Sequence, residues 1–170
     1  MNYLQDRVVY LAGPIKDVSD DGTSWRDLIT PRLKQYGLGV LDPCKKANGD
    51  EEIGDAKKKF KDIIMREDWK TLKEEFWPVV RWDLRSVDVA DFIIVDYNPE
   101  VSTVGTIHEM VVASFEKKPI LLKYNKSQLD KFNPWIGVFV KEHHFFPTWD
   151  NMFKYLDEVD AGRLDTSLWV

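Results

Sequence analysis

The sequence predicts a single α/β domain, residues 1–170, in which a central parallel sheet of about five strands is flanked by helices. Its 170 residues match the length of one typical domain. Short apolar runs alternate along the chain with segments whose apolar residues recur at helical spacing, which is the pattern of parallel βαβ units. No internal repeat, low-complexity tract or linker divides the sequence, and this favours one domain over two.

The first expected element is a strand over residues 7–12, an apolar run that ends at Gly13-Pro14 and therefore enters a tight loop. A helix is expected after the polar loop that follows, because apolar residues recur there at helical spacing. These residues are Trp25, Leu28, Ile29 and Leu33. Pro31 lies inside this pattern and predicts a kink or a late helix start, and Gly37 is a candidate C-cap.

The middle of the chain predicts one short strand and then helices. Residues 38–41 form a short apolar run, typical of a strand. Residues 44–58 are polar and rich in Gly, Asp and Lys, so we expect a loop there. Residues 56–76 predict an amphipathic helix with room for an interruption. Pro78 is expected to break this helix, and a further helix is expected over residues 79–89.

The clearest buried strand in the sequence is the apolar run at residues 92–96. A loop that holds Gly105 is expected next, followed by a helix over residues 109–116. Residues 118–122 predict another buried strand. This order again alternates strand and helix, as parallel pairing requires.

The end of the chain mixes aromatic-rich turns with a short strand near Val138, a helix over residues 149–156 and a tail. In parallel sheets of this class, ligands bind beyond the carboxyl ends of the strands. Four loops are therefore expected at the functional edge of the sheet. They are the loops at Gly13, Asp42, Tyr97 and Lys123.

Composition excludes several classes of function. The 24 Lys and Arg residues against 29 Asp and Glu residues give a net charge of −5, whereas proteins that bind a nucleic-acid polymer are normally basic. The single cysteine, Cys44, excludes an internal disulfide framework and fits a reducing compartment. The early apolar runs are far shorter than a membrane span, and the N-terminal residues lack the pattern of a secretory signal. We expect a cytoplasmic protein without nucleic-acid or membrane partners.

The sequence gives no convincing metal or cofactor motif. His108-Glu109 begins like a zinc-protease helix, but Val112 stands where the second histidine ligand would be. His143 and His144 are adjacent, and adjacent residues on a strand point to opposite faces. The loop after the first strand lacks the spacing of a phosphate-binding glycine motif. We therefore expect neither a metal nor a cofactor.

Three residues near the expected strand ends have types that suit catalysis. Glu109 is expected in the first turn of a helix, where the helix dipole favours the ionised carboxylate that a nucleophile needs. Asp83 lies shortly before a strand, and Tyr10 lies within one. From residue type alone, a helix-start charge, a surface aspartate and a core tyrosine are the commoner interpretations. The three residues in combination carry more information than any one of them.

Four motifs follow one another in a characteristic order. They are Tyr10-Leu-Ala-Gly-Pro-Ile15, Asp83 ahead of Ala90-Asp-Phe-Ile-Ile-Val95, Val104-Gly-Thr-Ile-His-Glu109 and Lys118-Pro-Ile120. This order and spacing, over residues 7–123, resembles the nucleoside 2-deoxyribosyltransferase family and the related 2′-deoxynucleoside 5′-monophosphate N-glycosidases. The resemblance implies a Rossmann- or flavodoxin-like three-layer fold. It also implies a nucleoside or nucleotide and a nucleobase as small-molecule partners, a homo-oligomer (a dimer or higher), and a place in purine or pyrimidine salvage.

The same resemblance implies a role for each motif residue. Glu109 corresponds to the nucleophile, which attacks C1′ of the deoxyribose and forms a glycosyl-enzyme intermediate. Asp83 corresponds to the aspartate that contacts the base and assists proton transfer to it. Tyr10 corresponds to the tyrosine that orients the nucleophile. Asn133 is a match for an asparagine that a neighbouring subunit contributes to hold the sugar.

Further residues are expected to bind the substrate. The first loop, with Gly13, Pro14 and Ile15, lies at the expected functional edge. Trp25 is a candidate to stack on the base, although a tryptophan is more often part of a core. Gly105 has no side chain and would let the sugar approach the backbone at the helix start.

The residues just before the Val-Gly element leave the substrate class open. The transferases usually have an acidic residue there, whereas this chain has Thr103 preceded by Ser102. The N-glycosidases tend to have a serine that contacts the 5′-phosphate, so Ser102, Thr103 and the amides near Gly105 are a candidate anion site. Pro14 stands where those glycosidases tend to have a serine in the first loop.

These observations rank three functions. Cleavage of the N-glycosidic bond of a 2′-deoxynucleoside, with transfer of the deoxyribose to another nucleobase, is predicted first. Hydrolysis of 2′-deoxynucleoside 5′-monophosphates to free base and deoxyribose 5-phosphate is the second prediction. A non-catalytic nucleotide-binding module on the same scaffold is the third, because a fold by itself does not imply activity.

Overall fold

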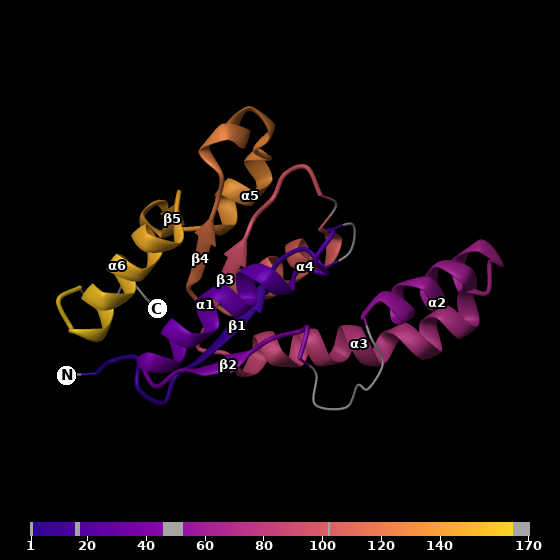
Figure 1. The fold of residues 1–170 in the computed structure, drawn as a ribbon, viewed down its shortest axis with the longest axis horizontal. Coiled ribbons are helices and arrows are strands. Elements are labelled where there is room, and N and C mark those ends of the chain that lie inside the picture. The colour runs from indigo at the N-terminus through magenta and orange to yellow at the C-terminus, as the bar shows by residue number, and fades with distance from the viewer. Residues whose placement is uncertain (1, 16–17, 46–52, 102, 165–170) are drawn as a thin grey trace.

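The five strands of the described chain form one parallel sheet in a computed structural model that describes residues 2–15, 18–45, 53–101 and 103–164 (Figure 1). The strand order is β2-β1-β3-β4-β5, and every neighbouring pair is parallel. The strands are β1 (Val8–Ala12), β2 (Gly39–Leu41), β3 (Phe92–Asp96), β4 (Ile120–Lys123) and β5 (Phe145–Phe146). The predicted parallel α/β sheet is confirmed.

Helices cover both faces of the sheet and make three layers (Figure 1). One core lies between the sheet and α1 (Thr23–Gln35) with α6 (Trp149–Asp160). A second core lies between the sheet and α3 (Trp69–Val89), α4 (Val104–Phe115) and α5 (Pro134–Phe139). Two short 3₁₀ helices, η1 (Lys126–Lys131) and η2 (Glu142–His144), complete the C-terminal third.

Alternation along β1 divides its side chains between these two cores. Val9 and Leu11 lie in the core beneath α1 and α6, whereas Tyr10 and Ala12 lie in the core beneath α3, α4 and α5. Successive side chains of a strand point to opposite faces, so this division follows directly from the strand geometry. Tyr10 is opposite Ile93 of β3 in the register. Tyr10 therefore points toward the helix that carries Glu109.

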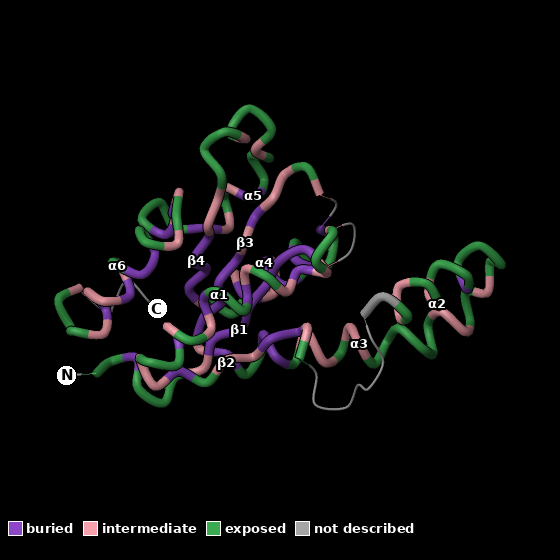
Figure 2. The backbone as a smooth tube through the Cα atoms, viewed as in Figure 1, coloured by how far each residue is buried: buried purple, intermediate pink, exposed green. Residues whose placement is uncertain are grey.

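A helical hairpin of α2 (Ile53–Met65) and α3 projects beyond the sheet layers (Figure 1). Most of this projecting part is exposed or half-buried, whereas the strands are mostly buried (Figure 2). The chain turns between the two helices at Glu67, whose φ is 56°. Asp68 then caps α3 by accepting a hydrogen bond from the amide of Thr71 at 3.1 Å. The expected interruption of residues 56–76 is this turn.

The hairpin also corrects two predictions. The predicted loop over residues 44–58 is too long, because α2 begins at Ile53. Pro78 does not break the helix, because α3 continues through it to Val89. A proline inside a helix costs about 3 kcal/mol. Val87, near the end of α3, is buried in the second core, and this packing opposes that cost and holds the helix against the sheet.

A strand near Val138 is also a wrong prediction, since Val138 lies in α5. Asn133 caps this helix by accepting a hydrogen bond from the amide of Trp135 at 3.0 Å, and Pro134 occupies its first turn, where a proline is well tolerated. The last strand is β5 instead. The expected tail falls largely on residues 165–170, which lie outside the described residues.

The remaining elements agree with the sequence pattern. Gly37 follows α1 with a φ of 76°, the left-handed conformation in which glycine often ends a helix. Pro31 lies within α1 without ending it. In the part of the chain that the structure describes, no helix is both long enough and apolar enough to cross a membrane.

Candidate active site

Tyr10 and Glu109 form a buried hydrogen-bonded pair at the carboxyl half of the sheet. The Tyr10 hydroxyl donates to Glu109 Oε1 at 2.8 Å. Tyr10 is fully buried and Glu109 is only 8% exposed. A carboxylate is rarely this buried unless it is paired, so the hydroxyl is a partner that the ionised form needs. Two residues that the sequence assigned to one site therefore meet in the fold.

Burial, together with the charge around the pair, keeps the tyrosine protonated. Burial raises the pKa of Tyr10 well above its ordinary value, and the negative charges of Glu109 and Asp83 raise this pKa further. The Arg26 charge opposes them weakly. Tyr10 is therefore a hydrogen-bond donor to Glu109 throughout the pH range in which proteins work. Its hydroxyl can orient the carboxylate but does not supply a proton for catalysis.

Asp83 reaches the same region from α3. Its charge acts on Tyr10, and its Oδ1 atom is shielded from solvent. α3 contacts both β1 and α4, so the helix holds Asp83 on the face of the sheet where Tyr10 and Glu109 lie. The structure thus brings together all three residues with predicted catalytic roles. The roles themselves stay predictions.

Glu109 lies in the second turn of α4, because the helix begins at Val104. The prediction of Glu109 in the first turn of a helix that begins near residue 109 is therefore wrong. The helix dipole acts mainly within the first turn, so it contributes less to this carboxylate than expected. The hydrogen bond from the Tyr10 hydroxyl stabilises the Glu109 carboxylate instead. The spacing of the buried α4 residues Thr106, Glu109, Met110 and Ala113 turns Glu109 toward the sheet.

The start of α4 holds two further predicted residues. Thr103 is 8% exposed and is the N-cap residue, but among the described residues no side chain caps this helix. A Cβ added to Gly105 would meet no atom within 4 Å in the described structure. This space is compatible with the prediction that a sugar can approach the backbone at Gly105. Ser102 lies outside the described residues.

The first loop is built by close backbone packing. A Cβ on Gly13 would lie 2.8 Å from Cζ2 of Trp25, so a side chain at this position would displace the indole. Pro14 is buried, and the Ile15 carbonyl accepts a hydrogen bond from Lys57 Nζ at 2.5 Å. Lys57 belongs to α2, so the projecting hairpin is tied to this loop.

Trp25 packs against two other side chains. Its ring stacks on Trp149, with 5.4 Å between centroids and 8° between planes. The Arg26 guanidinium also lies over the Trp25 ring, 4.5 Å from its centroid. These contacts favour a packing role for Trp25, and base stacking by this residue stays a prediction. Asn133 is exposed and caps α5, so within one chain its side-chain oxygen serves that helix.

Arg26 is a buried organiser of the first loop that sequence reasoning missed. Its guanidinium donates to the Leu11 carbonyl at 3.2 Å and 3.4 Å, to the Gly13 carbonyl at 3.1 Å and to the Gly22 carbonyl at 2.6 Å. Asp42, at the end of β2, pairs with it at 3.5 Å. Arg26 is fully buried, so one side chain joins the ends of β1 and β2 to the start of α1.

A signal for Arg26 was present in the sequence. Arg26, Ile29 and Leu33 occupy positions i, i+3 and i+7 of one helix, and all three are buried. A charged residue within an apolar stripe is a candidate for a buried polar network, since an unpaired buried charge is costly. No sequence pattern names its partners, because two of them are backbone carbonyls at the end of β1.

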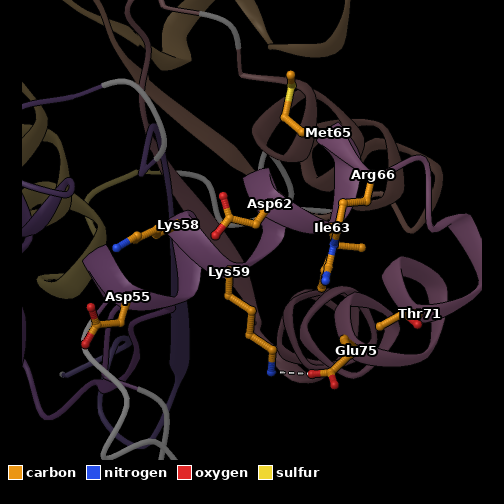
Figure 3. A pocket seen from close by; sticks show the side chains of 9 residues that line it. All are labelled: Asp55, Lys58, Lys59, Asp62, Ile63, Met65, Arg66, Thr71 and Glu75. Carbon is orange, nitrogen blue, oxygen red and sulfur yellow. Dashed lines mark hydrogen bonds and ion pairs between the residues drawn. The ribbon is translucent and has the colours of Figure 1, made fainter.

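Two hollows elsewhere in the described structure are lined by other residues. A groove of about 760 Å³ lies between α2 and α3 (Figure 3). Charged side chains line much of it, and Lys59 forms an ion pair with Glu75 across it. Among the described residues, no group of three or more His, Cys, Asp or Glu side chains is placed to hold a metal ion. The candidate site is the region around Tyr10, Asp83 and Glu109, because the structure brings these three residues together.

Comparison with known proteins gives structural relatives. The sequence matches no protein-family model and no curated protein. The structure resembles a 2-deoxyribosyltransferase from Bacillus psychrosaccharolyticus with a TM-score of 0.59 and 20% identity, covering 88% of this chain and 95% of that one. It resembles a 2-deoxyribosyltransferase from Leishmania mexicana with a TM-score of 0.59 and 15% identity, covering 89% and 97%. The solution structure of BlsM matches with a TM-score of 0.55 and 20% identity, covering 96% and 95%.

At these identities the likeness concerns the fold. The three-layer α/β fold that the motifs implied is confirmed by the sheet of this chain and by its similarity to these structures. The structural resemblance to 2-deoxyribosyltransferases also agrees with the family that the order of motifs suggested.

Proposed function

We propose that this chain cleaves the N-glycosidic bond of 2′-deoxynucleosides and transfers the deoxyribose to another nucleobase. The observation that carries the proposal is the buried hydrogen bond from Tyr10 to Glu109 Oε1, at 2.8 Å. It supplies a carboxylate held in one orientation, on a fold shared with 2-deoxyribosyltransferases. Retention of Tyr10, Asp83 and Glu109 in one region argues against a non-catalytic binding module.

In the first step, a Glu109 carboxylate oxygen attacks C1′ of the deoxyribose. The bond between C1′ and the base nitrogen breaks, and its electron pair stays on the base. Positive charge develops on the sugar ring as the bond breaks, and the adjacent carboxylate stabilises it before the new C–O bond forms. The product of this step is a deoxyribosyl ester of Glu109. Tyr10 positions the attacking carboxylate through its hydroxyl.

The departing base requires a proton, because a neutral base is a far better leaving group than its anion. Asp83 is the proposed donor, and its carboxyl proton passes to the base as the C1′–N bond breaks. Its placement beside Tyr10 and Glu109 supports this role. In the second step an acceptor base attacks C1′, returns its proton to Asp83 and releases the Glu109 carboxylate. Atoms and charge balance over the two steps.

A second candidate, hydrolysis of 2′-deoxynucleoside 5′-monophosphates, is favoured by the start of α4. Thr103 is buried there, and no described side chain caps the helix. The first amide groups of a helix remain available to an anion when no side chain caps them. Water would then replace the acceptor base in the second step, and the products would be free base and deoxyribose 5-phosphate.

Product analysis separates these candidates. The purified protein is incubated with 2′-deoxynucleosides and with their 5′-monophosphates, each with and without an acceptor base, and the products are resolved by chromatography. Base exchange supports transfer. Free base with deoxyribose, or with deoxyribose 5-phosphate, supports hydrolysis. Binding of these compounds without turnover would contradict both and identify a binding module.

A substitution tests the nucleophile. Glu109→Gln is expected to lower the rate at least about 1000-fold with the fold retained, because an amide cannot form the glycosyl ester. Acid-quenched wild-type protein should carry the added mass of one deoxyribosyl group, and the variant should not. Glu116→Gln, at the exposed end of α4, is the matched control and should keep the wild-type rate. A wild-type rate in Glu109→Gln would remove Glu109 as the nucleophile.

A further inference from the structure

The first loop lies where the connections of two neighbouring strands diverge. β1 lies between β2 and β3 in the sheet. The chain leaves β1 for α1 on one face of the sheet, and it leaves β3 for α4 on the other face. Ligands of parallel α/β sheets bind at such a switch point. A Cβ on Gly13 would lie 3.4 Å from the carbonyl oxygen of Asp96, the last residue of β3, so the first loop borders this point.

The first two residues of the loop are held by buried groups of the domain. Arg26, which is fully buried, donates to the Gly13 carbonyl at 3.1 Å. The Pro14 carbonyl packs against Gly22, where an added Cβ would lie 2.1 Å from the oxygen. Gly22 has a φ of 74°, which glycine adopts without strain. Loss of either contact would therefore disturb the packing at the start of α1.

The third residue of the loop is held from outside the three layers. Lys57 Nζ donates to the Ile15 carbonyl at 2.5 Å. The same ammonium group forms an ion pair with Asp21, which orients it. Lys57 belongs to α2, one helix of the hairpin that projects beyond the sheet (Figure 1). Its side chain is 29% exposed, so this contact can break without opening either core of the domain.

We propose that Lys57 is a positioning residue for the proposed reaction and holds the Gly13–Ile15 backbone in the conformation that receives the substrate. This role rests on the proposed function. A hydrogen bond from a charged donor is stronger than one between neutral groups, so its loss would free Ile15. Tyr10 and Glu109 are buried and would keep their own contact. A loop with more freedom must be ordered when the substrate binds, and this ordering lowers the affinity.

Steady-state kinetics of Lys57→Met, on the 2′-deoxynucleoside that the wild type cleaves, tests this role. Methionine keeps an apolar chain but lacks the ammonium group. KM is expected to rise about tenfold, the effect of losing one hydrogen bond from a charged donor. The kcat should change by less than about threefold, because Glu109 keeps its hydrogen bond from Tyr10. Lys57→Arg keeps a charged donor and should restore most of the affinity.

Lys58→Met is the matched control, because it removes the same charge from the next residue of α2. Lys58 lines the groove between α2 and α3 (Figure 3). Its substitution should leave KM unchanged, and circular dichroism verifies that all three variants retain the fold. An unchanged KM in Lys57→Met would overturn the proposal. An equal rise in Lys58→Met would also overturn it, because charge alone would then explain the effect. So would a fall in kcat at constant KM, because Lys57 would then act on the chemical step.

Amide NMR relaxation of Gly13 and Ile15 separates this proposal from the proposed reaction, because it needs no substrate. In Lys57→Met, motion at Ile15 should increase relative to the wild type and to Lys58→Met. Motion at Gly13 should change less, because Arg26 still holds its carbonyl. Unchanged relaxation at Ile15 would overturn the role of Lys57 whatever the kinetics show. A wild-type protein without turnover would instead overturn the proposed function, and the relaxation data would still decide whether Lys57 orders the loop.

Discussion

The Tyr10 hydroxyl and the Glu109 carboxylate meet at 2.8 Å inside the protein, although 99 residues separate them in the chain. β1 places the tyrosine on the face of the sheet that α4 covers, and α4 turns the glutamate inward. The hydrogen bond serves both groups, since it satisfies a buried hydroxyl and stabilises a buried carboxylate. It is the contact on which the proposed reaction depends most directly.

Removing this hydroxyl should impair catalysis. A hydrogen bond to a charged group contributes about 1.5–3 kcal/mol, so Tyr10→Phe is expected to lower kcat about 10–100-fold. The variant keeps the ring and therefore most of the packing of Tyr10 in the core. Steady-state kinetics on the nucleoside that the wild type cleaves provides the measurement.

Tyr36→Phe controls for loss of a half-buried tyrosine hydroxyl outside the site. The Tyr36 hydroxyl donates to Asp157 Oδ1 at 2.5 Å and joins α1 to α6. This variant should unfold at a lower temperature than the wild type but keep its kcat. An equal loss of kcat in both variants would mean that the Tyr10 effect comes from stability and not from the orientation of Glu109.

Asp83→Asn tests proton delivery to the base. A general acid must be protonated, so the wild-type rate should fall as pH rises and this acid loses its proton. The asparagine variant should be slower and should lack that dependence. The rate of the variant should be closest to the wild-type rate on a substrate whose base can leave without gaining a proton. A substrate with an acidic base is therefore the informative comparison. A pH profile identical to that of the wild type would exclude Asp83 as the donor.

Most of the fold could be predicted because its strands are short apolar runs with clear ends. The run Phe92–Asp96 is recognisable from sequence because it is buried on both faces of the sheet. Helix ends were less predictable, since local signals compete with packing. Pro78 indicates a helix end by its own chemistry, yet tertiary packing carries α3 past it. Val138 suits a strand by residue type, but the Asn133 cap starts a helix before it.

The candidate site also has residues that the sequence predicts and a residue that it does not. Tyr10, Asp83 and Glu109 belong to motifs, so the sequence identifies them before the fold is known. Arg26 belongs to none, and its importance appears only when the carbonyls of Leu11 and Gly13 are seen to converge on it. Every residue has a backbone carbonyl, so residue types in the sequence do not show which carbonyls a distant side chain will contact. Sequence reasoning therefore proposes the catalytic residues but misses Arg26, which holds the first loop.

A double-mutant cycle tests how Arg26 and Asp42 hold this loop. Arg26→Met leaves three carbonyls and the Asp42 carboxylate without their buried donor, so it should lower the free energy of unfolding by about 3–5 kcal/mol. Asp42→Asn should cost less, because the hydrogen bonds of Arg26 to the same three carbonyls remain. The double variant should be less destabilised than the sum of the two, by at least about 0.5 kcal/mol, because the pair interacts directly. Urea unfolding measures all four proteins, and additive effects would show that the two residues act separately.

His144 gives the last prediction, which concerns stability and pH. It is fully buried on η2, and its Nε2 lies 2.8 Å from the Tyr155 hydroxyl. Burial, and then the nearby charges of His143 and Lys141, lower the pKa of His144 to about 3. An unfolded histidine titrates at about 6.5. Between these two values the unfolded chain binds a proton that the folded chain does not, so stability falls as pH drops from about 6.5 toward 3.

Carboxylates also titrate in the lower part of this range, so the comparison must be between variants. His144→Gln should flatten the fall in unfolding temperature between pH 6.5 and pH 5, whereas exposed His143→Gln should keep the wild-type slope. Equal slopes in all three proteins would show that protonation of His144 does not limit stability in acid.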